Sequence, residues 1–133
     1  NPSSSFQSIH SSVMSCSLPA THEDPVDVVV KAGDTLTLRV PCQTNIWHRT
    51  FKVEGEEEEK KEYVEAPNQY LEISNKWRSG TLGKDINEAV VTVAEDGTLE
   101  MPSVSPADSA QYYTYYRGED GIHHYSYFNV KVE

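Results

Sequence analysis

Hydrophobic and polar residues alternate over many short stretches between residues 26 and 132. In residues 35–40, Leu36, Leu38 and Val40 alternate with polar neighbours, which is typical of a strand with one buried face. Asp96-Gly97, between two such stretches, favours a tight hairpin turn because both residues tolerate a positive φ angle. No stretch shows a convincing helical period. The pattern therefore predicts an all-β protein, either a sandwich or a barrel.

The predicted elements divide the chain into two parts. Residues 1–23 are rich in serine and lack periodicity, which indicates an irregular tail, and residues 24–133 carry the domain. The charged run 56–61 indicates the solvated tip of a hairpin, and an acidic metal or partner site is the alternative. Strands are expected at 26–30, 35–40, 46–53, 63–64, 70–73, 89–93, 98–101 and 110–117, a last strand ends at Val132, and a long loop is expected at 75–87.

Composition limits the size and the partners of the protein. A chain of 133 residues is long enough to bury one core. Its net charge of −10 argues against nucleic acid and anionic membranes as partners, because both attract basic surfaces. No apolar run approaches the ~20 residues that span a bilayer. We therefore expect no direct membrane insertion by this segment.

A motif near the C-terminus indicates a family. Asp108-Ser109-Ala110-Gln111-Tyr112-Tyr113-Thr114 resembles the Asp-x-Gly/Ala-x-Tyr-x-Cys signature of immunoglobulin domains, and Gly33-x-x-Leu36-x-Leu38-x-Val40 resembles their second strand. The resemblance covers residues 25–133. It implies an immunoglobulin-like β-sandwich of variable or intermediate type, with two antiparallel sheets and Greek-key connections. It also implies that Tyr112 packs in the core while its hydroxyl bonds backbone a few residues upstream. A different all-β domain with a chance motif is the alternative.

The chain departs from this family at the inter-sheet disulfide. Val40 and Thr114 occupy the two positions that carry the bridge in the family, so this bridge is absent. Core packing must then supply the ~2–4 kcal/mol that a disulfide typically contributes. Trp47 stands where the family's core tryptophan is expected, only seven residues after Val40, which is a shorter gap than usual.

The two cysteines, Cys16 and Cys42, match no metal-binding spacing. We expect them to form a disulfide that clips the N-terminal tail against the domain, provided that the compartment is oxidising. Two free buried thiols are the alternative, because a sequence does not establish that two cysteines lie close together.

Alternation also predicts a binding surface. If Ala110, Tyr112 and Thr114 point inward, their neighbours along the strand point outward. The resemblance implies that the last two strands are neighbours in one sheet, so their outward tyrosines form an exposed patch suited to partner binding. Cross-strand stabilisation by good strand formers is the alternative. The expected partner-binding residues are Tyr113, Tyr115, Arg117, Tyr125 and Tyr127.

No pattern of catalysis is present. The chain lacks a phosphate-binding glycine loop, a nucleophile elbow and an HExxH motif. The adjacent His123 and His124 point to opposite faces of a strand, so they do not chelate one ion there. We therefore expect neither an enzyme nor a bound cofactor or metal.

These observations favour an extracellular protein-recognition module, secreted or part of a cell-surface protein of the adhesion or receptor type. Its partner would be another protein or a second copy of the chain, bound through the tyrosine-rich sheet. The alternative is an intracellular structural immunoglobulin domain of a muscle or cytoskeletal protein, which the missing bridge favours.

Overall fold

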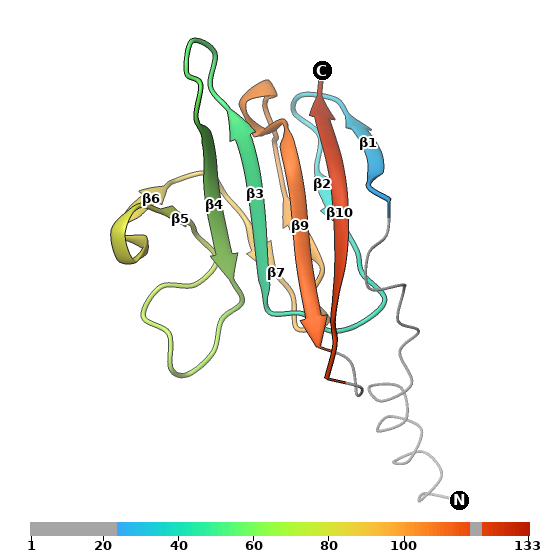
Figure 1. Cartoon of the computed structure of the whole chain (residues 1–133), viewed down its shortest axis with the longest axis vertical. Coiled ribbons are helices and arrows are strands. Elements are labelled where there is room, and N and C mark those ends of the chain that lie inside the picture. The colour runs from blue at the N-terminus through green and yellow to red at the C-terminus, as the bar shows by residue number, and fades with distance from the viewer. Residues whose placement is uncertain (1–23, 118–120) are drawn as a thin grey trace, which may run out of the picture.

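Within residues 24–117 and 121–133, which a computed structural model of the protein describes, ten strands form two sheets (Figure 1). The larger sheet has the order β1 (Val26–Val30), β10 (His123–Val132), β9 (Ala110–Arg117), β3 (Ile46–Lys52), β4 (Glu59–Glu65), β5 (Trp77–Ser79) and β6 (Asp85–Asn87). The smaller sheet has the order β2 (Leu36–Leu38), β8 (Leu99–Met101) and β7 (Thr92–Val93).

The strand order confirms the predicted fold class. β1 pairs with β10 in parallel, and the other paired strands of the described chain run antiparallel. The chain passes from the smaller sheet in β2 to the larger sheet in β3, and it returns to the smaller sheet in β7. β4 and β5 widen the larger sheet beyond β3, as the additional strands of variable-type immunoglobulin domains do.

The hydrophobic core lies between the two sheets. Trp47 and Trp77 of the larger sheet and Leu36, Leu38 and Leu99 of the smaller sheet are almost completely buried in one cluster. Inward residues of this kind follow from the two-residue period of the strands. Truncating such a fully buried aromatic side chain to alanine typically costs ~3–5 kcal/mol, so the cluster accounts for a large share of the stability.

The Asp96-Gly97 turn is closely packed against Trp47. The indole Nε1 of Trp47 donates a hydrogen bond to the carbonyl oxygen of Gly97 at 2.7 Å. Gly97 has a φ angle of 92°, and a Cβ atom at this position would lie 2.7 Å from the backbone nitrogen of Thr44. Only glycine fits this position, because both the φ angle and the close approach exclude a side chain.

Tyr112 closes the corner between the two sheets. Its ring is fully buried, and its hydroxyl donates to the carbonyl oxygen of Asp108 at 2.7 Å. Asp108 ends the 3₁₀ turn η2 (Pro106–Asp108), and its carboxylate accepts a hydrogen bond from the backbone N–H of Ser105 at 2.9 Å. Burial raises the pKa of Tyr112 to about 12, so the hydroxyl remains a donor at all physiological pH values.

Thr114, at one of the two positions aligned with the disulfide cysteines of immunoglobulin domains, is held by hydrogen bonds. Thr114 is fully buried, and its Oγ1 lies 2.7 Å from Oγ1 of Thr44 and also donates to the carbonyl oxygen of Ile46. Val40 lies just beyond β2, is half-buried and packs against the core cluster. Polar contacts around Thr114 and apolar packing around Val40 are therefore found at the two positions that the sequence resemblance aligns with the cysteines of immunoglobulin domains.

Two of the predicted elements are wrong. Residues 70–73 form no strand, and Tyr70 is 84% exposed. The expected loop at 75–87 contains β5, the 3₁₀ turn η1 (Thr81–Gly83) and β6, and it contributes the buried Trp77 to the core. The strands expected at 35–40 and 89–93 are also shorter than predicted, while 26–30 and 110–117 are confirmed. Residues 1–23, with the predicted tail, lie outside the described residues.

Candidate binding surface

The outward face of the larger sheet carries a continuous cluster of aromatic side chains. We call this cluster the aromatic face; its members are His48, Tyr63, Tyr113, Tyr115, His123, Tyr125 and Tyr127. The strand register explains why they meet: Tyr113 is paired with Tyr127, and Tyr115 with Tyr125, across β9 and β10. His48 in β3 lies between Tyr113 in β9 and Tyr63 in β4. The predicted tyrosines are thus brought together, and the cluster extends two strands further than expected.

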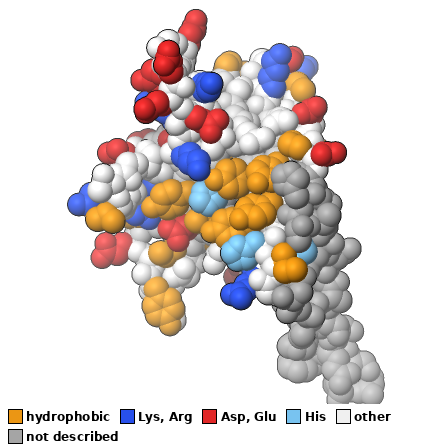
Figure 2. Space-filling model, viewed as in Figure 1, with side chains coloured by type: hydrophobic (Ala, Val, Ile, Leu, Met, Phe, Trp, Pro, Cys, Tyr) orange, Lys and Arg blue, Asp and Glu red, His pale blue; other side chains and the backbone are white. Residues whose placement is uncertain are grey.

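The rings of the aromatic face are in mutual contact. Ring centroids are 5.6 Å apart for Tyr113–Tyr127 and for Tyr115–Tyr125, and 6.0 Å for the stacked pair Tyr125–Tyr127. At the lower end of the sheet, His123 stacks on Tyr115 with centroids 5.4 Å apart. Each ring covers part of its neighbour and leaves the other part accessible. Figure 2 shows the resulting patch of hydrophobic side chains with histidines among them.

His48 lies at the centre of this cluster and was missed from the sequence. Its ring is nearly parallel to Tyr113, with centroids 4.9 Å apart, and its Nε2 is buried without a hydrogen-bond partner in the described part of the chain. Burial lowers the pKa of His48, and the nearby charge of Lys61 lowers it further. The side chain is therefore neutral at pH 7. The signal was available, because an inward Trp47 places the next residue on the outward face.

Charge is distributed unevenly around the aromatic face. The hairpin between β3 and β4 carries Glu54 and Glu56–Glu59 at one end of the sheet, and Lys60 pairs with Glu56 at 3.4 Å. At the opposite end, Arg117 follows the last tyrosines of β9 and is exposed. In Figure 2, acidic side chains gather at the hairpin, while histidine and a basic side chain border the other end of the patch. The side chains of the predicted hairpin tip are solvent-exposed.

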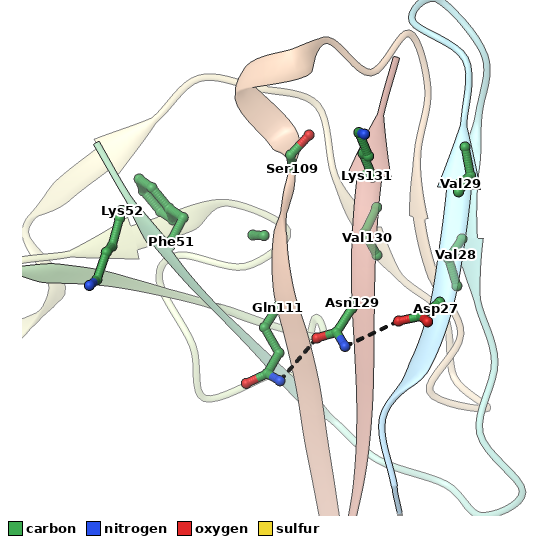
Figure 3. Close-up of a pocket in the computed structure, with 11 residues that line it drawn as sticks. Asp27, Val28, Val29, Phe51, Lys52, Ser109, Gln111, Asn129, Val130 and Lys131 are labelled. Atoms are coloured by element: carbon green, nitrogen blue, oxygen red, sulfur yellow. Dashed lines mark hydrogen bonds between the residues drawn. The ribbon is translucent and has the colours of Figure 1, made fainter. Parts of the chain in front are cut away.

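A polar groove continues the same sheet face toward β1. The Nε2 of Gln111 donates to Oδ1 of Asn129 at 3.1 Å, and Nδ2 of Asn129 donates to Oδ1 of Asp27 at 3.2 Å. Figure 3 shows these three side chains in one row across β9, β10 and β1, inside a groove of about 580 Å³. Lys52 and Lys131 line the groove as well. The face therefore changes from aromatic to hydrogen-bonding character along the strands.

A cluster of charged side chains lies on the inward side of the sheet. Arg49 is 3% exposed, its Nη2 lies 2.7 Å from Oε1 of Glu62, and its Nη1 lies 3.2 Å from Oδ1 of Asp108. The guanidinium also stacks 4.2 Å from the ring centre of Trp77 and donates to the Tyr112 hydroxyl at 2.9 Å. These contacts satisfy the buried charges internally, so the cluster supports the fold and is not part of the binding surface.

The remaining candidates do not form a chemical centre in the described residues. His124 is buried and stacks on Tyr116, whereas the neighbouring His123 is exposed on the aromatic face. In the described part of the chain, no group of three metal-binding side chains lies together. Among the same residues, no helix is long and apolar enough to cross a membrane. Cys42 is buried, and Cys16 lies outside the described residues, so their pairing stays a prediction.

Comparison with known proteins finds similarity in structure and none in sequence families. No protein-family model and no curated protein matches the chain. Among solved structures, the first Ig-like domain of human CD48 antigen matches with a TM-score of 0.48 and 16% sequence identity, over 88% of this chain and 89% of that chain. The fold assignment rests on this chain's own features: the strand order, the core between the two sheets and the Tyr112 corner. By these features, the chain is an immunoglobulin-like β-sandwich.

Proposed function

We propose that this domain is an extracellular protein-recognition module that binds its partner through the aromatic face. The observation that carries the proposal is the contact network of seven aromatic rings on an outward sheet surface, where no described element of the chain covers them. Tyrosine supplies a large contact area at a low cost in side-chain entropy, and its hydroxyl can exchange water for a partner group. Binding, and not catalysis, is the activity that such a surface supports.

Preorganisation supports a binding role for these rings. His48 and the tyrosines of β9 and β10 are held by stacking against each other, so little rotamer freedom remains to be lost when a partner docks. Burial, followed by the neighbouring Tyr115 and Tyr125, raises the pKa of Tyr113. The face therefore stays uncharged at its centre, which lowers the desolvation cost of covering it.

A specific observation favours an intracellular structural domain as the second candidate. Thr44 and Thr114 form a hydrogen-bonded pair at one of the two disulfide positions, so this point of the fold is held without the inter-sheet bridge that an oxidising compartment would allow. The prediction that Cys16 pairs with Cys42 separates the two candidates. Mass spectrometry of unreduced peptides from the protein in its own compartment would find the bridge in the extracellular case and two alkylatable thiols in the intracellular case.

The experiment for the aromatic face uses fluorescent tetramers of the domain on a panel of intact cells. Tyr115→Ser and Tyr127→Ser should each weaken cell binding by about tenfold, and the double variant should abolish it, because truncated aromatic anchors account for most interface energy. Tyr70→Ser is the matched control, since Tyr70 is 84% exposed and lies off the face. Unchanged staining by the double variant would refute the proposal.

Self-association is tested in the same set of proteins. If the partner is a second copy of the chain, sedimentation equilibrium will show a dimer that the Tyr115→Ser/Tyr127→Ser double variant loses. A monomer in all variants, with cell binding retained in the wild type, assigns the face to a different protein.

A further inference from the structure

A small pocket lies at the end of the aromatic face where β9 finishes and β10 begins. Its volume is about 350 Å³, and its walls include Asn45, Tyr115, Arg117 and His123. Tyr115 and His123 line the pocket and also belong to the aromatic face, where their ring centroids are 5.4 Å apart. A partner that covers the tyrosines therefore also covers the mouth of this pocket.

The side chains of the pocket favour an anionic group. Arg117 and His123 are both exposed, and none of the lining residues in the described part of the chain is acidic. Among the described residues, no carboxylate lies within ion-pair distance of the Arg117 guanidinium. A planar guanidinium is the side chain best suited to hold a carboxylate through two parallel hydrogen bonds, and an adjacent imidazole and amide can add donors.

The polar side chains of Gln43 and Thr44 in the pocket wall already have hydrogen-bond partners. The amide nitrogen of Gln43 donates to the carbonyl oxygen of Glu95 at 2.8 Å, and the hydroxyl of Thr44 lies 2.7 Å from that of Thr114. Among the described lining residues, Arg117, His123 and Asn45, together with the hydroxyl of Tyr115, remain to contact a ligand. Their position is unusual for this chain, because its net charge is −10 and the opposite end of the face carries the glutamate-rich hairpin.

We propose that this pocket is an anion subsite that receives an aspartate or glutamate side chain of the protein partner. The subsite rests on the proposed function. It specifies that the partner packs against the aromatic face and carries an acidic residue beside that contact. Charge complementarity supports a single carboxylate on a protein. An extended polyanion such as nucleic acid or an anionic membrane would meet the repulsion of the acidic hairpin and of the net negative charge.

The test is a titration of the isotope-labelled full chain, followed by NMR at the Arg117 Nε–Hε signal and the His123 imidazole signals. The probe is N-acetyl-glutamate amide, and N-acetyl-glutamine amide is the uncharged isostere. We expect saturable shifts with a Kd on the order of millimolar for the acid and no saturation for the amide. Added salt should weaken the binding because the subsite is exposed.

Variants with a matched change of charge define the site. Arg117→Gln should lower the affinity for N-acetyl-glutamate amide by about tenfold or more, because it removes a charge-assisted pair. Lys131→Gln makes the same charge change in the polar groove and should leave the affinity unchanged. Glu119 and Asp120 lie outside the described residues but follow Arg117 in the sequence, so the titration is repeated in a Glu119→Gln/Asp120→Asn background to remove any internal competitor.

Three outcomes would overturn the proposal: no saturable binding in either background, equal binding of the amide, or tighter binding of a methyl sialoside than of the glutamate derivative. The last outcome would assign the pocket to a glycan carboxylate. The titration needs no partner, so it is independent of the cell-binding experiment. Loss of cell binding in the tyrosine variants without anion binding would remove only the subsite, and anion binding with unchanged cell binding would remove only the aromatic face.

Discussion

The imidazole ring of His48 lies parallel to the phenol ring of Tyr113, with an interplanar angle of 10° and centroids 4.9 Å apart. Tyr115 stacks on the same imidazole from the adjacent position at 5.9 Å. The two phenol rings exclude water from Nε2 of His48, so the neutral form of this side chain belongs to the folded state. A proton added to His48 would place a charge in the centre of an uncharged surface.

This relationship predicts a pH-dependent stability. The pKa of His48 in the folded state is below its ordinary value of 6.5, so the unfolded chain binds more protons as the pH falls through 6.5. The contribution of His48 is fully present above pH 6.5 and is lost as the pH falls toward the folded-state pKa. Urea denaturation at about pH 7.5 and about pH 5 should show a larger loss of stability in the wild type than in His48→Gln. An equal loss in both proteins would contradict the prediction.

The corner formed by Tyr112 predicts a difference between two neighbouring tyrosines. Tyr112→Phe removes the donor to the carbonyl oxygen of Asp108 and an acceptor for buried Arg49, so we expect the free energy of unfolding to fall by about 1–3 kcal/mol. Tyr113→Phe removes a hydroxyl on the outward face and should change it by less than about 0.5 kcal/mol. Denaturant unfolding measures both, and equal losses would show that the corner bond does not contribute.

Because Arg49 and Glu62 form a buried ion pair, substitutions of the two residues should have non-additive effects on the free energy of unfolding. Glu62→Gln leaves the guanidinium of Arg49 undercompensated in the core, so we expect a loss of about 3 kcal/mol. Adding Arg49→Met removes that buried charge and should recover about 1 kcal/mol or more of stability. Glu65→Gln is the control, because its pair with Arg78 is more exposed and should contribute less than about 1 kcal/mol. If the losses in the free energy of unfolding are strictly additive in the double variant, this interpretation is wrong.

Gly97 and Gly55 allow the strain of a turn to be separated from a steric clash. Both have positive φ angles, 92° and 87°, but only a Cβ atom at Gly97 would meet other atoms, those of Thr44. We expect Gly55→Ala to cost about 1 kcal/mol from backbone strain alone. Gly97→Ala should cost clearly more, because the turn must also move away from Thr44 and weaken the hydrogen bond of Trp47. Thermal unfolding compares the two variants, and similar costs would argue against the clash.

The sequence predicted those parts of the fold in which local pattern and burial agree. In β9, residues 112–116 alternate between buried and half-buried positions. The resemblance to immunoglobulin domains implied the inward Tyr112, and parity then placed its neighbouring tyrosines on the outward face. β5 and β6 were missed because each has three residues of mixed polarity, too few to show a period. The position of β5 depends on Trp77, which packs into a core built by distant strands, and no local pattern indicates this contact.

The candidate site was predicted in part for the same reason. The four tyrosines of β9 and β10 were found by alternation, whereas His48 and Tyr63 join them only through the register of β3 and β4. Arg49 was passed over because a charged residue is expected to face solvent, and its partner Asp108 lies 59 residues away in the sequence. Long-range pairing of this kind requires the three-dimensional structure.

The parallel pairing of β1 with β10 determines how the domain bears a mechanical load. Val26 lies beside Phe128 and Val30 beside Val132, so the chain enters at one end of this ladder and leaves at the other. Tension between the two ends of the domain would shear the backbone hydrogen bonds of the ladder together instead of opening them one after another. A parallel edge pair of this kind would therefore resist extension more strongly than a pair whose bonds open in sequence.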